Sequence, residues 1–158
     1  MNEDLSFIGR YRSKGALFDA NLLLVYVVGK CCQGRLPTFH HTKQYAGEFD
    51  TIGRLFEYFG TVYTTPNVLT EVSNLGKKLG VDFFDQLESI VQVLDEQFCT
   101  SKDAVSSVRF RDLGLTDSAL LTIGPRFLIV TADAKLYLAL RASNIDAVNY
   151  NHIRFYWS

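Results

Sequence analysis

Apolar residues occur along this chain in two alternating patterns. Short continuous runs rich in β-branched and aromatic residues are typical of buried strands, and longer stretches with apolar residues three or four apart are typical of helices. The runs predict strands at residues 15–18, 61–65, 127–131 and 146–150. The longer stretches predict helices at 20–28, 48–59, 66–75 and 82–95 and helices that begin at 116 and 133, and the last turn of 82–95 is open to a strand instead. Strands that alternate with helices predict a three-layer α/β/α fold with a central, mainly parallel sheet.

Signals for helix starts and stops agree with these boundaries. Thr65 precedes Pro66, and a threonine cap followed by proline is favoured at a helix start. Thr116 is expected to cap the helix that carries Asp117, and residues 124–125, Gly-Pro, are expected to end it.

Two segments depart from the alternation. Residues 29–47 are rich in Gly, Lys, His, Thr and Gln and contain Pro37, so we expect an irregular loop or a poorly anchored insertion. An aromatic tail at residues 152–157 follows the last predicted strand. Exposing its apolar side chains as a patch would be costly, so we expect them to pack on the domain, with a contact to another chain as the alternative.

Composition supports one domain spanning residues 1–158, with a core at about 15–150. A chain of 158 residues that is 47% hydrophobic can bury a substantial core. The formal net charge is -1, so a nucleic-acid partner would have to be held by local patches. Cys31, Cys32 and Cys99 show no pattern of a zinc site or disulfide framework, which favours a reducing cytoplasm. The acidic start and the short apolar runs predict neither secretion nor membrane insertion.

Three acids lie at or just after predicted strand ends or at helix starts: Asp19, Asp117 and Asp133. A fourth, Glu71, lies on a helix that directly follows a predicted strand. Taken singly, each has an ordinary role as a cap, a first-turn residue or a solvated helix residue. Parallel sheets, however, bind ligands beyond the carboxyl ends of their strands, where these acids would meet and repel one another. A hard cation such as Mg²⁺ or Mn²⁺ relieves this repulsion, and such a site suits phosphodiester hydrolysis.

The motifs around these acids resemble those of a known family. The segments 18–23, 65–73, 115–120 and 130–136 are similar to the successive motifs of PIN domains, and the resemblance covers about residues 15–150. Family members are typically Mg²⁺- or Mn²⁺-dependent ribonucleases that act on single-stranded RNA. The resemblance implies that the four acids are the metal-binding and catalytic carboxylates. It also implies that Asn21 and Thr131 support them through hydrogen bonds. Helix capping is the alternative role for Asn21, and β propensity is the alternative for Thr131.

The resemblance also bears on partners. The expected substrate is single-stranded or structured RNA, and many PIN domains are toxins of toxin–antitoxin pairs, so an antitoxin protein or a second copy of the chain is a further candidate. His40, His41, Lys43 and Tyr45 place basic and aromatic groups in a predicted loop, and Lys135 follows Asp133 on a helix. These residues are candidate RNA contacts, with solvated surface as the alternative.

Two other functions are open. A phosphatase with an aspartyl nucleophile at Asp19, of the haloacid dehalogenase type, would need a second aspartate two positions later, where this chain has Asn21. A catalytically silent PIN-like module that binds RNA or protein would keep the fold without the reaction.

Overall fold

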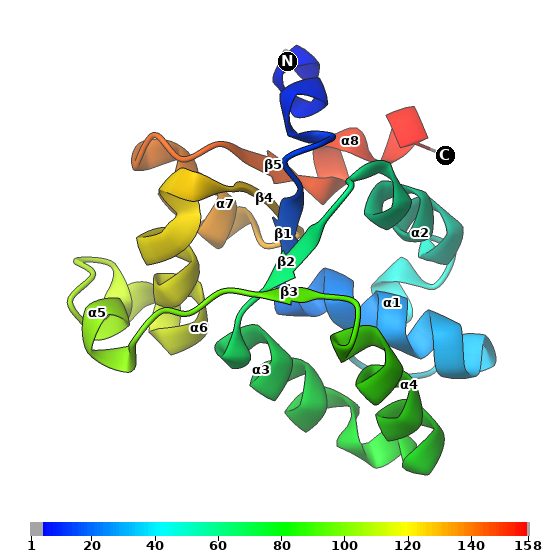
Figure 1. Ribbon diagram of the computed structural model, residues 1–158. Coiled ribbons are helices and arrows are strands. Elements are labelled where there is room, and N and C mark those ends of the chain that lie inside the picture. Colours follow the sequence, from blue (N-terminus) through cyan, green and yellow to red (C-terminus); the bar gives the residue numbers. More distant parts are fainter. Residues whose placement is uncertain (1–4, 158) are drawn as a thin grey trace.

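A five-stranded sheet forms the centre of the computed structural model, which describes residues 5–157 (Figure 1). The strands are all parallel, in the order β3-β2-β1-β4-β5. They are β1 (Ala16–Phe18), β2 (Val62–Thr64), β3 (Asp95–Glu96), β4 (Leu128–Thr131) and β5 (Ala147–Asn149). The expected α/β/α class with a parallel sheet is confirmed. The acidic start of the chain, at residues 1–4, and the last residue lie outside the described part.

Helices follow the strands in the predicted alternation. They are α1 (Ala20–Cys32), α2 (Phe49–Tyr58), α3 (Pro66–Gly76), α4 (Val81–Val91), α5 (Ser101–Val105), α6 (Phe110–Ile123), α7 (Ala134–Ala142) and α8 (Tyr150–Trp157). Short 3₁₀ helices lie at Leu5–Tyr11, Gln33–Arg35, Lys43–Tyr45, Lys77–Leu79 and Gly124–Arg126. The stretch 82–95, whose last turn could be helix or strand, forms the helix α4 followed by the two-residue strand β3.

The order of the strands reverses at β1. From β1 the chain adds β2 and then β3 on one side of the sheet, and it returns to place β4 and β5 on the other side. Both β1 and β4 are buried along their whole length, as apolar strands covered on two faces must be. The carboxyl ends of β1 and β4 therefore form a topological switch point, the usual position of a ligand site in an open parallel sheet. These ends lie toward the lower part of Figure 1, where α1 and α3 begin.

The segment 29–47 is anchored, which corrects one of the sequence expectations. Its first residues belong to α1, and the rest forms turns and 3₁₀ helices rather than a long irregular loop. Four side chains along it are buried, those of Leu36, Phe39, Thr42 and Tyr45. The prediction of a poorly anchored insertion is wrong, because three of these residues, Leu36, Phe39 and Tyr45, belong to the hydrophobic core of the domain.

The aromatic tail is helical and only partly packed. Ile153 is buried, and the ring of Trp157 lies edge-on to that of Tyr58, with the centroids 4.7 Å apart. Phe155 and Tyr156, in contrast, are each 72% exposed. The prediction that the tail packs on the domain is confirmed for Ile153 and Trp157 and wrong for Phe155 and Tyr156. The helix directs these two pairs of side chains to different sides.

The cysteines differ from expectation. The structure joins Cys31 to Cys32, adjacent residues at the end of α1, in a disulfide, and Cys99 is free and partly buried. The sequence had predicted no disulfide, because neighbouring cysteines do not form the spaced pattern of a disulfide framework. Among the helices of residues 5–157, none has the length and hydropathy that a bilayer-spanning segment requires.

Candidate active site at the carboxyl ends of the strands

Asp19 lies at the switch point between β1 and β4. It caps α1, and its Oδ1 accepts a hydrogen bond of 2.9 Å from the Leu22 backbone N–H. Its Oδ2 accepts a bond of 3.0 Å from the Ala132 N–H and a second bond from the Thr131 hydroxyl. The side chain is only 3% exposed, and burial raises the pKa of its carboxyl despite these hydrogen bonds. Asp19 is therefore a buried carboxylate held from three directions.

Asp133 stands at the end of β4, next to Asp19. It caps α7 through a bond of 2.9 Å from the Leu136 N–H to its Oδ1. Its own backbone N–H donates to the Thr131 hydroxyl at 2.9 Å, and that hydroxyl in turn donates to Asp19. Thr131 thus joins the two acids, as its predicted supporting role requires. Asn21 lies partly buried in the first turn of α1, and no hydrogen bond joins its side chain to the four acids within residues 5–157.

Asp117 reaches the site from α6, which is interrupted three residues earlier. Gly114 adopts φ +80°, a conformation that favours glycine, and the helix restarts after it. The predicted cap at Thr116 is wrong, because the break occurs at Gly114 and Thr116 lies inside the restarted helix. We find no hydrogen bond to the Asp117 carboxylate within the described part of the chain.

The four acids act on one another electrostatically. The pKa of Asp117 is raised to about 7, first by burial and then by the negative charges of Asp19, Asp133 and Glu71. The positive charge of Lys135 opposes this shift in pKa. Glu71 lies partly buried on α3, the helix that Thr65 caps through a bond of 3.1 Å to the Val68 N–H. The charges of Asp19, Asp133 and Glu71 therefore all act on Asp117.

The arrangement is open rather than a closed cage. Within residues 5–157, no three acid, histidine or cysteine side chains are grouped closely enough to hold a metal ion as they stand. Asp19 is buried, Glu71 and Asp117 are partly buried, and Asp133 is exposed, so the site is open to solvent on one side. Its acceptors are carboxylate oxygens, which suit hard cations and the water molecules bound to them.

Sequence reasoning missed three residues beside the acids. Tyr45 is buried, and its pKa is raised first by burial and then by the charge of Asp19, while a hydrogen bond with the Asn151 side chain lowers it. The Asn151 Nδ2 also donates to the Ala132 carbonyl at 3.2 Å, and its backbone N–H donates to Asn149 Oδ1 at 3.0 Å. Asn149 ends β5, so its place after a predicted strand was a usable signal. Tyr45 was predicted only as part of a loop that could contact RNA, and nothing in the polar segment 29–47 indicates its place beside Asp19.

Of the candidate RNA contacts, Lys135 lies nearest to the acids. Its Nζ donates to the Asp112 carbonyl at 2.5 Å, and its charge acts on Asp117. His40, His41 and Lys43 are exposed on the segment that leads to Tyr45, and the two histidine rings lie 5.2 Å apart. No hydrogen bond or ion pair links these three side chains to the four acids in the part of the chain that the structure describes.

A pocket of about 630 Å³ opens next to the acids. We call it the Glu71 pocket, since Glu71 lines it together with other residues of α3, of the segment before α5 and of the restarted α6. These include Asn67, Thr70, Asn74, Phe98 and Thr116.

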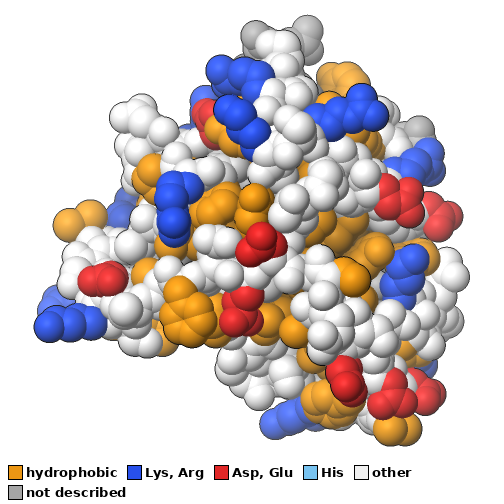
Figure 2. Space-filling model, viewed as in Figure 1, with side chains coloured by type: hydrophobic (Ala, Val, Ile, Leu, Met, Phe, Trp, Pro, Cys, Tyr) orange, Lys and Arg blue, Asp and Glu red, His pale blue; other side chains and the backbone are white. Residues whose placement is uncertain are grey.

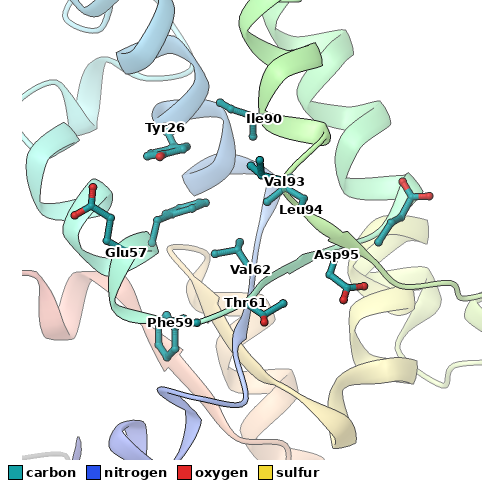
Figure 3. Close-up of a pocket in the computed structure, with 12 residues that line it drawn as sticks. Tyr26, Glu57, Phe59, Thr61, Val62, Ile90, Val93, Leu94 and Asp95 are labelled. Carbon is teal, nitrogen blue, oxygen red and sulfur yellow. The ribbon is translucent and has the colours of Figure 1, made fainter.

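A second pocket, of about 560 Å³, lies beside the amino-terminal end of β2 (Figure 3). The side chains of Tyr26, Val62 and Ile90 line it, with Glu57 and Asp95 at its sides. Figure 2 shows the same face of the molecule, where acidic side chains over β3 interrupt a band of hydrophobic surface. Because this pocket is at the opposite end of the strands from Asp19, it is not part of the acid site.

Comparisons of the chain with protein-family models, with curated proteins and with solved structures find no match. The resemblance to PIN domains therefore depends on the sequence motifs alone.

Proposed function

We propose that this chain is a PIN-like, Mg²⁺- or Mn²⁺-dependent endoribonuclease that hydrolyses phosphodiester bonds of RNA. The observation that carries the proposal is the position of the buried Asp19 at the carboxyl ends of β1 and β4, where the Thr131 hydroxyl joins it to the backbone of Asp133. The pKa of Asp117, raised to about 7 first by burial and then by the charges of Asp19, Asp133 and Glu71, supports it. Such a cluster costs folding stability, and costs of this kind are typical of functional sites. RNA as the substrate depends on the resemblance of the four motifs.

The acids fit a hard divalent cation. Mg²⁺ keeps several of its waters and commonly binds proteins through one or two carboxylates, so an open set of acids suits it better than a closed cage. Asp19, Glu71, Asp117 and Asp133 would hold the ion. When bound, the ion would lower the pKa of a water molecule and neutralise charge on the phosphoryl oxygens.

The chain's own residues hold the acids in place. Thr131 and the Ala132 N–H orient Asp19, and the Thr131 hydroxyl fixes the backbone of Asp133. Lys135 brings a positive charge close to Asp117, where it would favour a phosphate group. These contacts restrict the motion of the acids before any substrate binds, which is what electrostatic catalysis requires.

Substitution of Asp117 is the sharpest test. Asp117→Asn keeps the side-chain shape and breaks no hydrogen bond that we find, so the fold should persist while Mn²⁺-dependent cleavage of a labelled single-stranded RNA falls at least about 100-fold. Asp85→Asn, at an exposed position of α4, is the matched control and should retain activity. Equal cleavage by both variants, with unchanged circular dichroism, would refute the assignment.

Two rival functions are tested separately. Asn21 stands where a phosphatase with Asp19 as its nucleophile would need a second aspartate, which disfavours that function, and a stable acyl-phosphate on Asp19 would reverse this conclusion. Absence of Mn²⁺ binding in titration calorimetry would favour a catalytically silent binding module. For the toxin role, a small, overlapping open reading frame immediately upstream would indicate an antitoxin partner.

A further inference from the structure

The Glu71 pocket is lined by polar side chains that are not part of the acid site. Asn67, Thr70, Glu71 and Asn74 are spaced i, i+3, i+4 and i+7 along α3, so they share one face of that helix. The opposite face carries Val68 and Val72, which are buried in the core. The polar face of α3 therefore forms one wall of the pocket, and Glu71 belongs to both the wall and the acid site.

The charge of this pocket excludes one class of ligand group. Glu71 is the one charged side chain in its described lining, and its charge is negative. A phosphate bound there would be repelled, with no lysine or arginine to compensate. Neutral groups remain, and the side-chain amides of Asn67 and Asn74 make no hydrogen bond that we find within residues 5–157. Each amide can both donate and accept, as the edge of a nucleobase requires.

An aromatic side chain stands at the rim of the same pocket. Phe98 lies between β3 and α5 and is 74% exposed, although a phenylalanine gains free energy when it is covered. Thr100, two residues later, already uses its hydroxyl to cap α5, where it accepts from the Asp103 N–H at 3.1 Å. Phe98 thus offers a free ring face, and base stacking on aromatic rings is the common way in which proteins hold unpaired nucleotides.

We propose that the Glu71 pocket binds one unpaired nucleobase of the RNA, with the base stacked on Phe98 and its edge hydrogen-bonded by Asn67 and Asn74. This inference rests on the proposed function for the identity of the polymer. Since Glu71 lies in both places, a base in the pocket belongs to a nucleotide close to the scissile phosphate. The pocket volume, about 630 Å³, falls within the range of roughly 300–1,000 Å³ usual for small-ligand sites.

A set of abasic RNAs tests the stacking. The probe is a labelled single-stranded oligouridine, compared with versions that lack the base at one successive position each. Phe98→Ala should lower kcat/KM for the intact oligomer about ten-fold, since stacking contributes roughly 1–3 kcal/mol per base. At one position the abasic oligomer should lower kcat/KM by at least this factor with the unchanged protein. With Phe98→Ala the loss at that position should be smaller, because only the hydrogen bonds of Asn67 and Asn74 remain to be lost. Effects that multiply at every position would overturn the proposal.

Controls separate stacking from folding. Phe155→Ala removes an equally exposed phenylalanine from α8, which packs against α2 and β5, and it should leave kcat/KM within about two-fold. Phe98→Tyr keeps an aromatic ring and should restore kcat/KM. Loss of activity in Phe98→Tyr as large as in Phe98→Ala would contradict a stacking role.

Photocrosslinking gives a readout that needs no cleavage. Oligouridine with 5-iodouridine at one position should crosslink to the peptide that contains Phe98, as mapped by mass spectrometry. A crosslink at Phe98 without any cleavage by the unchanged protein would refute the nuclease and keep the base pocket. Cleavage that depends on Asp117, with crosslinks only elsewhere, would refute the base pocket and keep the nuclease.

Discussion

Thr131 is the residue on which the geometry of the acids most depends. Its hydroxyl donates to Asp19 and accepts from the Asp133 N–H, and the side chain is fully buried. Thr131→Val keeps a similar side-chain shape but removes the hydroxyl, so Asp19 and the Asp133 N–H each lose one hydrogen bond. We expect the free energy of unfolding to fall by about 1–3 kcal/mol, because buried polar groups without partners are costly. Urea unfolding in EDTA measures the change.

Thr131→Ser is the control for this substitution. It keeps the hydroxyl and loses only a methyl group, so it should retain most of the metal-dependent cleavage that Thr131→Val loses. A Thr131→Val protein with the stability and activity of the unchanged chain would show that the hydroxyl does not hold the acids.

At the residue scale, the sequence predicted the acids because of where they stand in the chain. Asp19 and Asp133 follow apolar strands, and both also cap helices, so their roles in folding made them easy to find. Tyr45 could not be found in this way. Its place beside Asp19 depends on the folding of the segment 29–47, and no local pattern encodes that contact.

At the scale of elements, the segment 29–47 is the one whose anchoring most needs a test. Leu36 is fully buried between two 3₁₀ helices, whereas Gln44 is exposed on the second. Leu36→Ala should lower the free energy of unfolding by about 2–5 kcal/mol, the usual cost of truncating a buried leucine. Gln44→Ala should change it by less than about 0.5 kcal/mol. Equal effects in urea titrations would mean that the segment is loosely attached.

The elements differ in how far the sequence predicts them. The central strands β1 and β4 are apolar throughout, since both of their faces are covered, and they are recognised without ambiguity. β3 consists of two exposed acids, so its pairing with β2 could not be separated from the end of the preceding helix. The sequence predicts no helix between residue 95 and residue 116, so α5 and the part of α6 before Gly114 were missed.

At the scale of the whole molecule, the alternation of elements predicts a parallel sheet but not the order of its strands. The pairing of β1 with β4 joins segments more than a hundred residues apart, and it alone places Asp19 beside Thr131 and Ala132. The sequence predicted that the acids would meet at one edge. Which atoms hold them follows only from this long-range pairing.

The burial of the acids and their mutual repulsion should make the stability of the metal-free protein depend on pH. The pKa of Asp117 is raised from its ordinary value of 3.8 to about 7, so the folded protein binds this proton more tightly than the unfolded chain does. The contribution of Asp117 to stability is therefore fully present below about pH 4 and is lost as the pH rises toward 7. The pKa of Asp19 is also raised, and its effect on stability has the same sign.

We therefore expect the Tm of the unchanged protein in EDTA to fall between about pH 4 and pH 7. The Asp117→Asn side chain cannot ionise, so the Tm of that protein should fall less over the same range. At pH 7 the Tm of Asp117→Asn should be the higher of the two, by on the order of a few degrees. Mn²⁺ should reverse this order, because an ion that binds only the folded state raises its Tm and needs the charge of Asp117. Scanning calorimetry of both proteins, with and without Mn²⁺, provides the comparison. Identical pH profiles in EDTA would mean that neither burial nor the neighbouring charges raise the pKa of Asp117. An equal Mn²⁺ effect in both proteins would place the ion elsewhere.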